Sequence, residues 1–361
     1  MKGVEGMDMS GWPSEWTAYE SLPLMEKGVA LRGAKHVLVA QQFVREDLEV
    51  LGELATVIRR VSKSQEGARF LKGLLCDKRA MLYFAQPSSR TYLSFLAACQ
   101  ILGLDTMDVR DSKTSSEVKG ESPEDTVRTF SSYADLIVMR HPQGGFAERV
   151  AWMLAHSNRE VPVINAGSGA DQHPTQALLD VYTLARSFEK RGGIDGKTVL
   201  FAGDLKRGRT VRSLAWMLTL FEGVNVVFAA PEALQIGADI QVLLREAGVP
   251  FRLCDRVQEA LPEADAVYMT RLQDEWDGEG EQSSLSETDF CVGVEELKLM
   301  KPEAVIMHPL PRRHEISREL DNEPQAIYWR QMRNGMWIRA ALILQRFGRE
   351  GLVLDSREEW A

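Results

Sequence analysis

The stretch of sequence that decides the fold runs from residue 80 to residue 98. Residues 80–85 (AMLYFA) form an apolar run typical of a buried strand, residues 88–91 (SSRT) form a hydroxyl-rich turn, and residues 92–98 (YLSFLAA) open a helical pattern. In this order the N–H groups of the first helical turn lie beside Ser, Thr and Arg donors, a set that suits a phosphate. The stretch alone is equally consistent with an N-capped helix that carries a surface arginine.

Short apolar segments alternate with helical patterns along the chain after residue 34. The strand-like segments are residues 80–85, 135–140, 161–165, 198–202, 224–229, 251–254, 265–270 and 304–307. Between them, residues 122–125 (SPED) supply an N-cap, a proline and two acids, and residues 174–190 form a longer helical pattern. This alternation predicts an α/β fold with two doubly wound parallel sheets and helices on both faces of each.

The order of these segments divides the chain into two predicted domains. Residues 1–34 lack a steady apolar period, so we expect an N-terminal extension that is poorly ordered or docks on a neighbouring molecule. Residues 35–190 form the first domain and residues 191–334 the second, with residues 191–196 as the linker. The last helical pattern, within residues 335–354, is long enough to cross back and pack on the first domain.

The composition limits the classes of function. The 361 residues carry a formal net charge of −9, which argues against a nucleic-acid surface, because long polyanions need a basic face. No apolar run reaches membrane-spanning length, and the first residues lack a basic-then-apolar signal pattern. The four cysteines and six histidines are scattered, so we expect reduced cysteines, a cytoplasmic location and no bound metal.

Four short motifs follow predicted strands. They are residues 88–91 (SSRT), 173–176 (HPTQ), 203–210 (GDLKRGRT) and 308–312 (HPLPR). Each of these short matches is weak alone, but four of them in this order are specific. On these motifs the chain resembles the aspartate/ornithine carbamoyltransferase family, and within it the aspartate branch, over about residues 35–354.

The resemblance implies a site for carbamoyl phosphate. Its residues are Ser88, Ser89, Arg90, Thr91, Arg140, His173, Gln176, Pro309 and Leu310. Of these, Arg90, Thr91 and His173 would surround the carbonyl oxygen as the catalytic donors, because the tetrahedral intermediate is negative at that atom. Without the resemblance, His173 is more often a capping or packing residue, and Arg140 a solvated residue at a strand end.

The carbamoyl NH₂ group would be held by acceptors from two motifs. The resemblance implies that Gln176 and the backbone carbonyls of Pro309 and Leu310 accept its hydrogen bonds. The bond from Leu310 to Pro311 is a candidate cis peptide, because cis bonds are almost confined to X-Pro and occur in tight turns.

The second substrate would be an amino acid with two carboxylates. The resemblance implies that Arg209, Arg271, Gln273 and Lys119 bind aspartate, and two fork-shaped guanidiniums suit two carboxylates. Ornithine would instead require acidic residues, so the Arg271-x-Gln273 pair favours aspartate. Ser115 and Lys119 match a loop that enters the site of the adjacent subunit in the family, which implies a homotrimer or a higher assembly.

The chain departs from the family pattern at several positions near these motifs. Where the family usually has Glu, Arg, Glu, Asp and Arg, this sequence has Gln86, Tyr92, Leu96, Ser168 and Trp276. None of the five is assigned to direct substrate contact, so they bear on affinity, domain motion and cooperativity more than on activity.

The resemblance implies carbamoyl transfer from carbamoyl phosphate to L-aspartate, with neither a metal nor a cofactor. Three alternatives stay open: a relative that uses another amine acceptor, a degenerate paralogue that acts as a scaffold or regulatory partner, and a dinucleotide-binding dehydrogenase. The last is disfavoured, because no strand is followed by G-x-G-x-x-G. Whether regulatory or dihydroorotase-like chains bind is also open.

Overall fold

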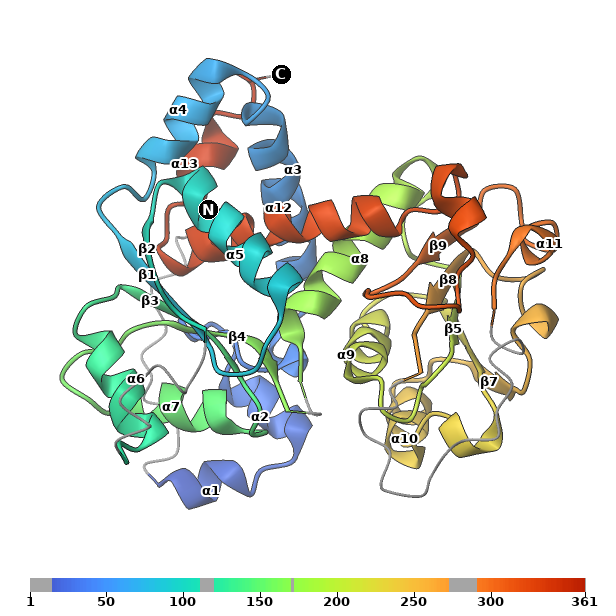
Figure 1. Ribbon diagram of the computed structural model, residues 1–361, viewed down its shortest axis with the longest axis horizontal. Helices are drawn as coiled ribbons and strands as arrows, with labels where there is room; N and C mark the ends of the chain where they lie inside the picture. The colour runs from blue at the N-terminus through green and yellow to red at the C-terminus, as the bar shows by residue number, and fades with distance from the viewer. Residues whose placement is uncertain (1–14, 111–119, 170–171, 273–290, 361) are drawn as a thin grey trace. The chain divides into compact units, whose positions relative to one another are not determined.

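The computed structural model describes residues 15–110, 120–169, 172–272 and 291–360. The chain forms two compact units, the first comprising Met1–Leu179 with Gly335–Ala361 and the second comprising Asp180–Asn334 (Figure 1). No helix among the described residues is long and apolar enough to cross a membrane. Each unit is built around one parallel sheet.

The sheet of unit 1 has four strands in the order β2-β1-β3-β4, and all neighbours are parallel. Its strands are β1 (Arg79–Phe84), β2 (Asp105–Val109), β3 (Leu136–His141) and β4 (Val163–Ser168). Its other elements are α1 (Trp16–Glu20), α2 (Leu24–Ala30), η2 (Ala40–Gln42), α3 (Arg45–Val61), α4 (Gln65–Gly73), α5 (Ser89–Leu102), α6 (Pro123–Ser131), α7 (Phe146–Ala155) and α13 (Glu350–Asp355).

Helices cover both faces of this sheet. Met81 and Tyr83 of β1 point into a core that includes Val127 of α6 and Phe146 of α7. Because side chains alternate along a strand, Phe84 points to the opposite face, where α5 lies (Figure 1). The sheet is therefore buried between two helical layers, as expected for parallel strands.

The N-terminal residues that the structure describes belong to unit 1. Tyr19 and Leu31 are completely buried in the core shared with α6 and α7. The Tyr19 hydroxyl donates a hydrogen bond to Glu148 Oε2 at 2.8 Å, and Trp16 packs on Trp152 with the ring centroids 6.0 Å apart. The sequence predicts an extension here, but residues 16–34 are instead packed into the unit. The side chains that hold this segment in the core, Trp16, Tyr19, Leu22, Leu31 and Ala34, do not follow a regular apolar period.

The sheet of unit 2 has five parallel strands in the order β7-β6-β5-β8-β9. Its strands are β5 (Thr198–Ala202), β6 (Asn225–Ala229), β7 (Phe251–Cys254), β8 (Ala266–Met269) and β9 (Val305–Met307). Its other elements include η5 (Glu189–Arg191), α9 (Arg209–Leu218), η6 (Glu232–Leu234), α10 (Ala238–Glu246), η7 (Val257–Glu259), α11 (Val294–Leu297) and η10 (Arg318–Asn322).

Both faces of this second sheet are also covered. Leu200, Val227 and Val267 point into one core, which Leu297 of α11 helps to close. The alternate residues Phe201 and Phe228 stack on the other face at 5.5 Å, the face on which α9 and α10 lie (Figure 1).

Two helices carry the chain from one unit to the other. They are α8 (Pro174–Phe188) and α12 (Tyr328–Arg346), and the units divide within them, after Leu179 and after Asn334. The chain therefore first passes from unit 1 to unit 2 within α8, and not in residues 191–196. One continuous helix can contribute side chains to two cores, so no linker is needed at this point. The second passage returns the C-terminal helices to unit 1, where α13 packs on α3. The predicted fold, two doubly wound parallel sheets with a returning C-terminal helix, is confirmed.

Candidate active site

The turn after β1 presents the N-terminus of α5. Ser88 is extended, with φ −163° and ψ 97°, and α5 begins at Ser89. The Ser88 hydroxyl donates to Thr91 Oγ1 at 3.0 Å and makes no capping bond to the helix backbone. The N–H groups of the first turn therefore point out of the helix without a side-chain cap, beside the Ser89 hydroxyl and Arg90, which are exposed. This arrangement suits an anion.

The end of β3 adds a second guanidinium to this region. Arg140 is paired in register with Phe84 of β1, and its carbonyl accepts the N–H of Gln86 at 3.1 Å. The Arg140 side chain is only 8% exposed, and its Nη1 donates to the carbonyl of Ala166 at 3.2 Å. Arg140 is therefore a buried residue at the carboxyl edge of the sheet and not a solvated one.

Gly167 brings Arg140 and His173 against the same piece of backbone. Gly167 has φ +115°, and a Cβ built on it would lie 2.6 Å from Arg140 Nη1 and 3.3 Å from His173 Cδ2. Only glycine accepts both this backbone conformation and this approach. The turn at the end of β4 thus holds a guanidinium and an imidazole next to one another.

His173 and Gln176 are placed by the start of α8. The His173 carbonyl accepts the N–H groups of Gln176 at 3.0 Å and Ala177 at 3.3 Å, so His173 is the residue that immediately precedes α8 and accepts its first hydrogen bonds. Both side chains are buried, at 4% exposure for His173 and 9% for Gln176. The structure places these predicted residues at the carboxyl end of β3 or at the start of the helices that follow β1 and β4, at one edge of the sheet: Ser88, Ser89, Arg90, Thr91, Arg140, His173 and Gln176.

Asn165 is a supporting residue that the sequence analysis did not single out. Its Oδ1 accepts the N–H of Gly167 at 2.9 Å, and its Nδ2 donates to Ser168 Oγ and to the Leu38 carbonyl, both at 3.0 Å. Asn165 thereby fixes the turn against which Arg140 and His173 lie. The available signal was an amide at the end of the otherwise apolar run of residues 161–165.

In unit 2, the loops after β5 and β8 are joined by their backbones. The N–H of Thr270 donates to the Ala202 carbonyl at 2.8 Å, and its Oγ1 donates to the same oxygen at 3.0 Å. A Cβ on Gly203, which has φ +106°, would lie 2.0 Å from the Thr270 carbonyl oxygen. This close approach fixes Arg271, the next residue, beside the loop that leads to Arg209.

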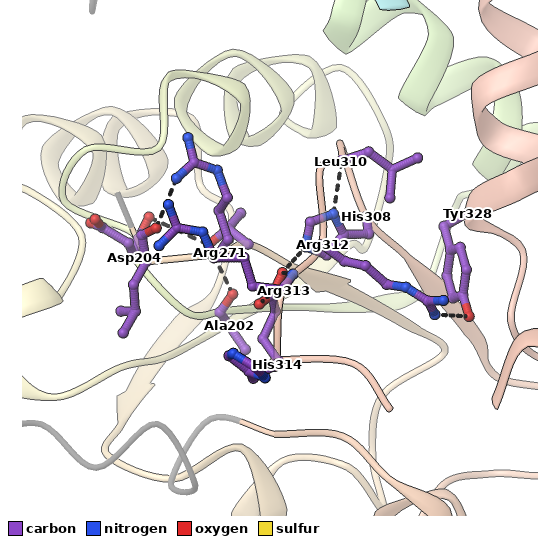
Figure 2. Close-up of polar contacts among 12 residues, drawn as sticks. Ala202, Asp204, Arg271, His308, Leu310, Arg312, Arg313, His314 and Tyr328 are labelled. Carbon is purple, nitrogen blue, oxygen red and sulfur yellow. Dashed lines mark hydrogen bonds and ion pairs between the residues drawn. The ribbon is translucent and has the colours of Figure 1, made fainter. Parts of the chain in front are cut away.

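That loop is closed by a buried carboxylate. Asp204 is completely buried, and its Oδ1 accepts the N–H of Arg207 at 3.1 Å while its Oδ2 lies 3.8 Å from Arg207 Nη1. Two residues later, α9 begins at Arg209. Arg209 and Arg271 are both half-buried, and Arg271 Nη1 donates to the Leu272 carbonyl at 3.0 Å (Figure 2).

The turn after β9 completes this edge of the second sheet. The Leu310-Pro311 peptide is cis, which confirms the expectation, and Leu310 has φ +57°, in the left-handed region. Strands β5, β8 and β9 are neighbours in the sheet, so the residues that follow them, Arg209, Arg271 and the pair Pro309 and Leu310, lie along one carboxyl edge.

Several residues of interest lie outside the described part of the chain. Ser115, Lys119 and Gln273, and with them the departure at Trp276, belong to this group. In the described part, no group of three or more His, Cys, Asp or Glu side chains is placed to hold a metal ion.

The departures that are described are built into unit 1. Tyr92 is buried, edge-to-face on Phe84 at 5.5 Å, and the guanidinium of Arg110 lies 4.3 Å from the centre of its ring. Burial and then the nearby Asp108 raise the pKa of Tyr92. Leu96 and Gln86 are half-buried. Tyr92 is therefore held in unit 1 by an aromatic pair and a stacked arginine.

The two sheet edges have different chemistry. The edge of unit 1 offers an uncapped helix N-terminus, two guanidiniums and an imidazole, which suits a tetrahedral dianion and an adjoining carbonyl oxygen. The edge of unit 2 offers two guanidinium forks, which suit carboxylates.

The sequence matches two models of one family. Residues 35–186 match the model described as aspartate/ornithine carbamoyltransferase, carbamoyl-P binding domain, and residues 195–345 match the Asp/Orn binding domain of the same family. The chain belongs to the aspartate/ornithine carbamoyltransferase family.

Its relatives place it in the aspartate branch. It is 41% identical over 328 residues to aspartate carbamoyltransferase 1, chloroplastic, of Pisum sativum, covering 90% of this chain and 81% of that one. It is 40% identical over 309 residues to the aspartate carbamoyltransferase catalytic subunit of Chromobacterium violaceum, covering 86% and 96%. The solved structure of Trypanosoma cruzi aspartate transcarbamoylase with carbamoyl phosphate matches with a TM-score of 0.77 at 37% identity, covering 87% and 96%.

Proposed function

We propose that this chain transfers the carbamoyl group of carbamoyl phosphate to the amine of L-aspartate. The products are N-carbamoyl-L-aspartate and phosphate, and the reaction is a step of de novo pyrimidine biosynthesis. The observation that carries the proposal is the convergence of Arg140 and His173 on Gly167, at the same sheet edge as the uncapped N-terminus of α5.

The phosphate of the first substrate binds at the N-terminus of α5. Ser88, Ser89, Arg90 and Thr91 donate to its oxygens, and Arg140 supplies a second positive charge. A dianion gains from both the partial positive charge of the helix and the charge-assisted hydrogen bonds. Because Arg140 is already fixed by the Ala166 carbonyl, little side-chain entropy is lost on binding.

The carbonyl oxygen is polarised by Arg90, Thr91 and His173. When the amine attacks, this oxygen becomes negative, and donors already fixed around it lower the barrier. A single fixed donor of this kind contributes about 2.7–4 kcal/mol. Gln176 and the carbonyls of Pro309 and Leu310 hold the carbamoyl NH₂, which orients the carbon for attack.

Aspartate binds at the edge of unit 2 through its two carboxylates. Arg209, Arg271 and Gln273 bind them, together with Lys119, and the neutral amine attacks the carbamoyl carbon. The new C–N bond forms, the C–O bond to phosphate breaks, and the leaving phosphate takes the proton of the attacking amine. The chain's own groups therefore act by position and charge, without a dedicated acid or base.

A bisubstrate analogue tests this assignment directly. A molecule that joins a phosphonate to aspartate should bind the wild-type protein in calorimetry, and Arg209→Ala and Arg271→Ala should each weaken its binding by at least tenfold. Unchanged affinity in both variants would contradict the assignment of the aspartate site.

The assembly we propose is a homotrimer or a higher assembly of trimers. Ser115 and Lys119 of one chain would complete the site of the neighbouring chain. Complementation tests this: Arg90→Ala and Lys119→Ala chains, each inactive alone, should regain activity when mixed and reassembled. If every site is complete within one chain, mixing will restore nothing.

We further propose a cytoplasmic location for the protein, supported by four cysteines that are scattered along the sequence. Cell fractionation tests it. Turnover by the purified chain will show whether a regulatory or dihydroorotase-like partner is needed for activity.

A further inference from the structure

The turn after β9 is tied together by the side chain of one histidine. His308 is 2% exposed, and its Nδ1 accepts the N–H of Leu310 at 2.7 Å (Figure 2). On the other side of the ring, His308 Nε2 lies 2.7 Å from Glu315 Oε1. The imidazole therefore lies inside the turn and forms hydrogen bonds with Leu310 and Glu315.

These contacts define the protonation state of the ring. An N–H group can donate to His308 Nδ1 only if this nitrogen carries no proton, so the proton lies on Nε2 and is donated to Glu315. Burial alone would raise the pKa of Glu315, but the hydrogen bond from His308 and the N–H of Arg313 hold it below its usual value. A charged Glu315 acceptor thus selects the Nε2–H tautomer.

The backbone of His308 is anchored by a second set of buried contacts. The N–H of His308 donates to Gln331 Oε1 at 2.8 Å, and Gln331 Nε2 donates to Asp180 Oδ1 at 2.7 Å. The other oxygen of Asp180 accepts the hydroxyl of Tyr268 at 2.8 Å. Asp180, Gln331 and Tyr268 are each at most 1% exposed and come from α8, α12 and β8. One end of the turn is therefore fixed to three elements of unit 2.

We propose that His308 is a positioning residue for the first substrate: it holds the Pro309 and Leu310 carbonyls in the orientation that accepts the carbamoyl NH₂. Gln331 and Asp180 hold the backbone of His308 in place through the hydrogen bonds from its N–H to Gln331 and from Gln331 to Asp180. The inference rests on the proposed function for the role of the two carbonyls, while the locked tautomer stands on the contacts alone.

The Leu310 backbone explains why such a residue is needed. Leu310 has φ +57°, a conformation that a leucine rarely adopts, so its peptide needs an external partner to stay in place. The hydrogen bond from its N–H to His308 Nδ1 is that partner. Without it, the turn can relax toward an ordinary conformation, and the Leu310 carbonyl, on the same residue, turns away from the substrate.

Two substitutions separate the two nitrogens of the ring. His308→Asn keeps an acceptor near the position of Nδ1 and loses the donor to Glu315. His308→Gln keeps a donor near the position of Nε2 and loses the acceptor for Leu310. The proposal predicts that His308→Gln raises the KM for carbamoyl phosphate about tenfold, the usual effect of one lost hydrogen bond, and that His308→Asn raises it less than about threefold.

The KM for aspartate should change little in either variant, with thermal unfolding used to check that both fold. Equal loss of carbamoyl phosphate affinity in the two variants, the reverse order, or no effect in either would overturn the proposal, because a merely structural histidine does not distinguish the two nitrogens.

A second measurement, the ¹⁵N spectrum of the histidine rings, depends neither on enzyme activity nor on an active variant. The chain has six histidines, and all of them give signals in protein labelled with ¹⁵N-histidine. The signal that is missing from the spectrum of His308→Asn is therefore that of His308. Near neutral pH it should show an unprotonated Nδ1 and a protonated Nε2, and a protonated Nδ1 would overturn the inference. If the protein does not transfer a carbamoyl group, the proposed function is wrong. The spectrum still tests which ring nitrogen of His308 carries the proton.

Discussion

Replacing Gly167 with alanine should disable the carbamoyl phosphate site through the position of Arg140. The added Cβ would lie 2.6 Å from Arg140 Nη1, whereas ordinary contact begins at 3.4 Å, so the guanidinium must move by roughly 0.8 Å. A misplacement of about 1 Å at a reacting centre can cost on the order of 100-fold in rate. We therefore expect kcat/KM for carbamoyl phosphate, measured by phosphate release, to fall about 100-fold.

A control variant is needed to separate the displacement of Arg140 from the backbone strain that alanine causes at residue 167. Gly167 has φ +115°, a conformation that L residues rarely adopt, and alanine there costs on the order of 1–3 kcal/mol of stability. Gly192 also has a positive φ, +83°, with nothing within 4 Å of a built Cβ, so Gly192→Ala adds backbone strain and no collision. Both variants should lose stability to denaturant, but only Gly167→Ala should lose activity. The reasoning is refuted if Gly167→Ala turns over as fast as Gly192→Ala.

Three further outcomes follow from the same structure. Arg90→Ala should lower kcat at least about 1,000-fold, because phosphate binding and carbonyl polarisation fail together; near-normal turnover would remove Arg90 from the site. Arg271→Ala should raise the aspartate KM by about 10- to 100-fold while carbamoyl phosphate affinity stays within about twofold; parallel loss of both would contradict the division of the substrates between the units. Burial, with the charges of Lys35 and Arg346, lowers the pKa of His36 from 6.5 to about 3. Between these two pH values the unfolded chain binds a proton at His36 and the folded chain does not. Stability should fall as the pH drops through this window, by up to about 1.4 kcal/mol per pH unit, and denaturation of His36→Asn should show a shallower fall; identical slopes would exclude His36 as the cause.

Much of the fold could be predicted from the sequence because most of its strands are buried on both faces. A strand buried on both faces is apolar at nearly every position, and seven of the nine strands among the described residues are buried in this way. The two edge strands differ: β7 (Phe251–Cys254) is mostly exposed but still has a short partly apolar sequence, FRLC, whereas β2 (Asp105–Val109), with the sequence DTMDV and no buried residue, left no apolar run to detect. The helices at residues 16–30 were missed for a related reason, because a few long-range contacts hold them and not a periodic face.

The site could be predicted only in part. The described motif residues lie at the carboxyl edges of the two sheets, and their roles in binding stay predictions; the cis bond before Pro311 followed from the turn motif. The supporting contacts could not be found in this way. Asp180 and Gln331 are separated by 151 residues and meet only because α8 and α12 both contribute to unit 2. An acid inside the helical pattern of residues 174–190 was the one sequence signal of this network.

Phosphate release by the purified chain tests the central claim most directly. Carbamoyl phosphate is supplied with either L-aspartate or L-ornithine, with a chelator present and no partner protein added. We expect rapid release that depends on aspartate, and no release above background with ornithine. Preference for ornithine, or no release with either amino acid, would contradict the central claim.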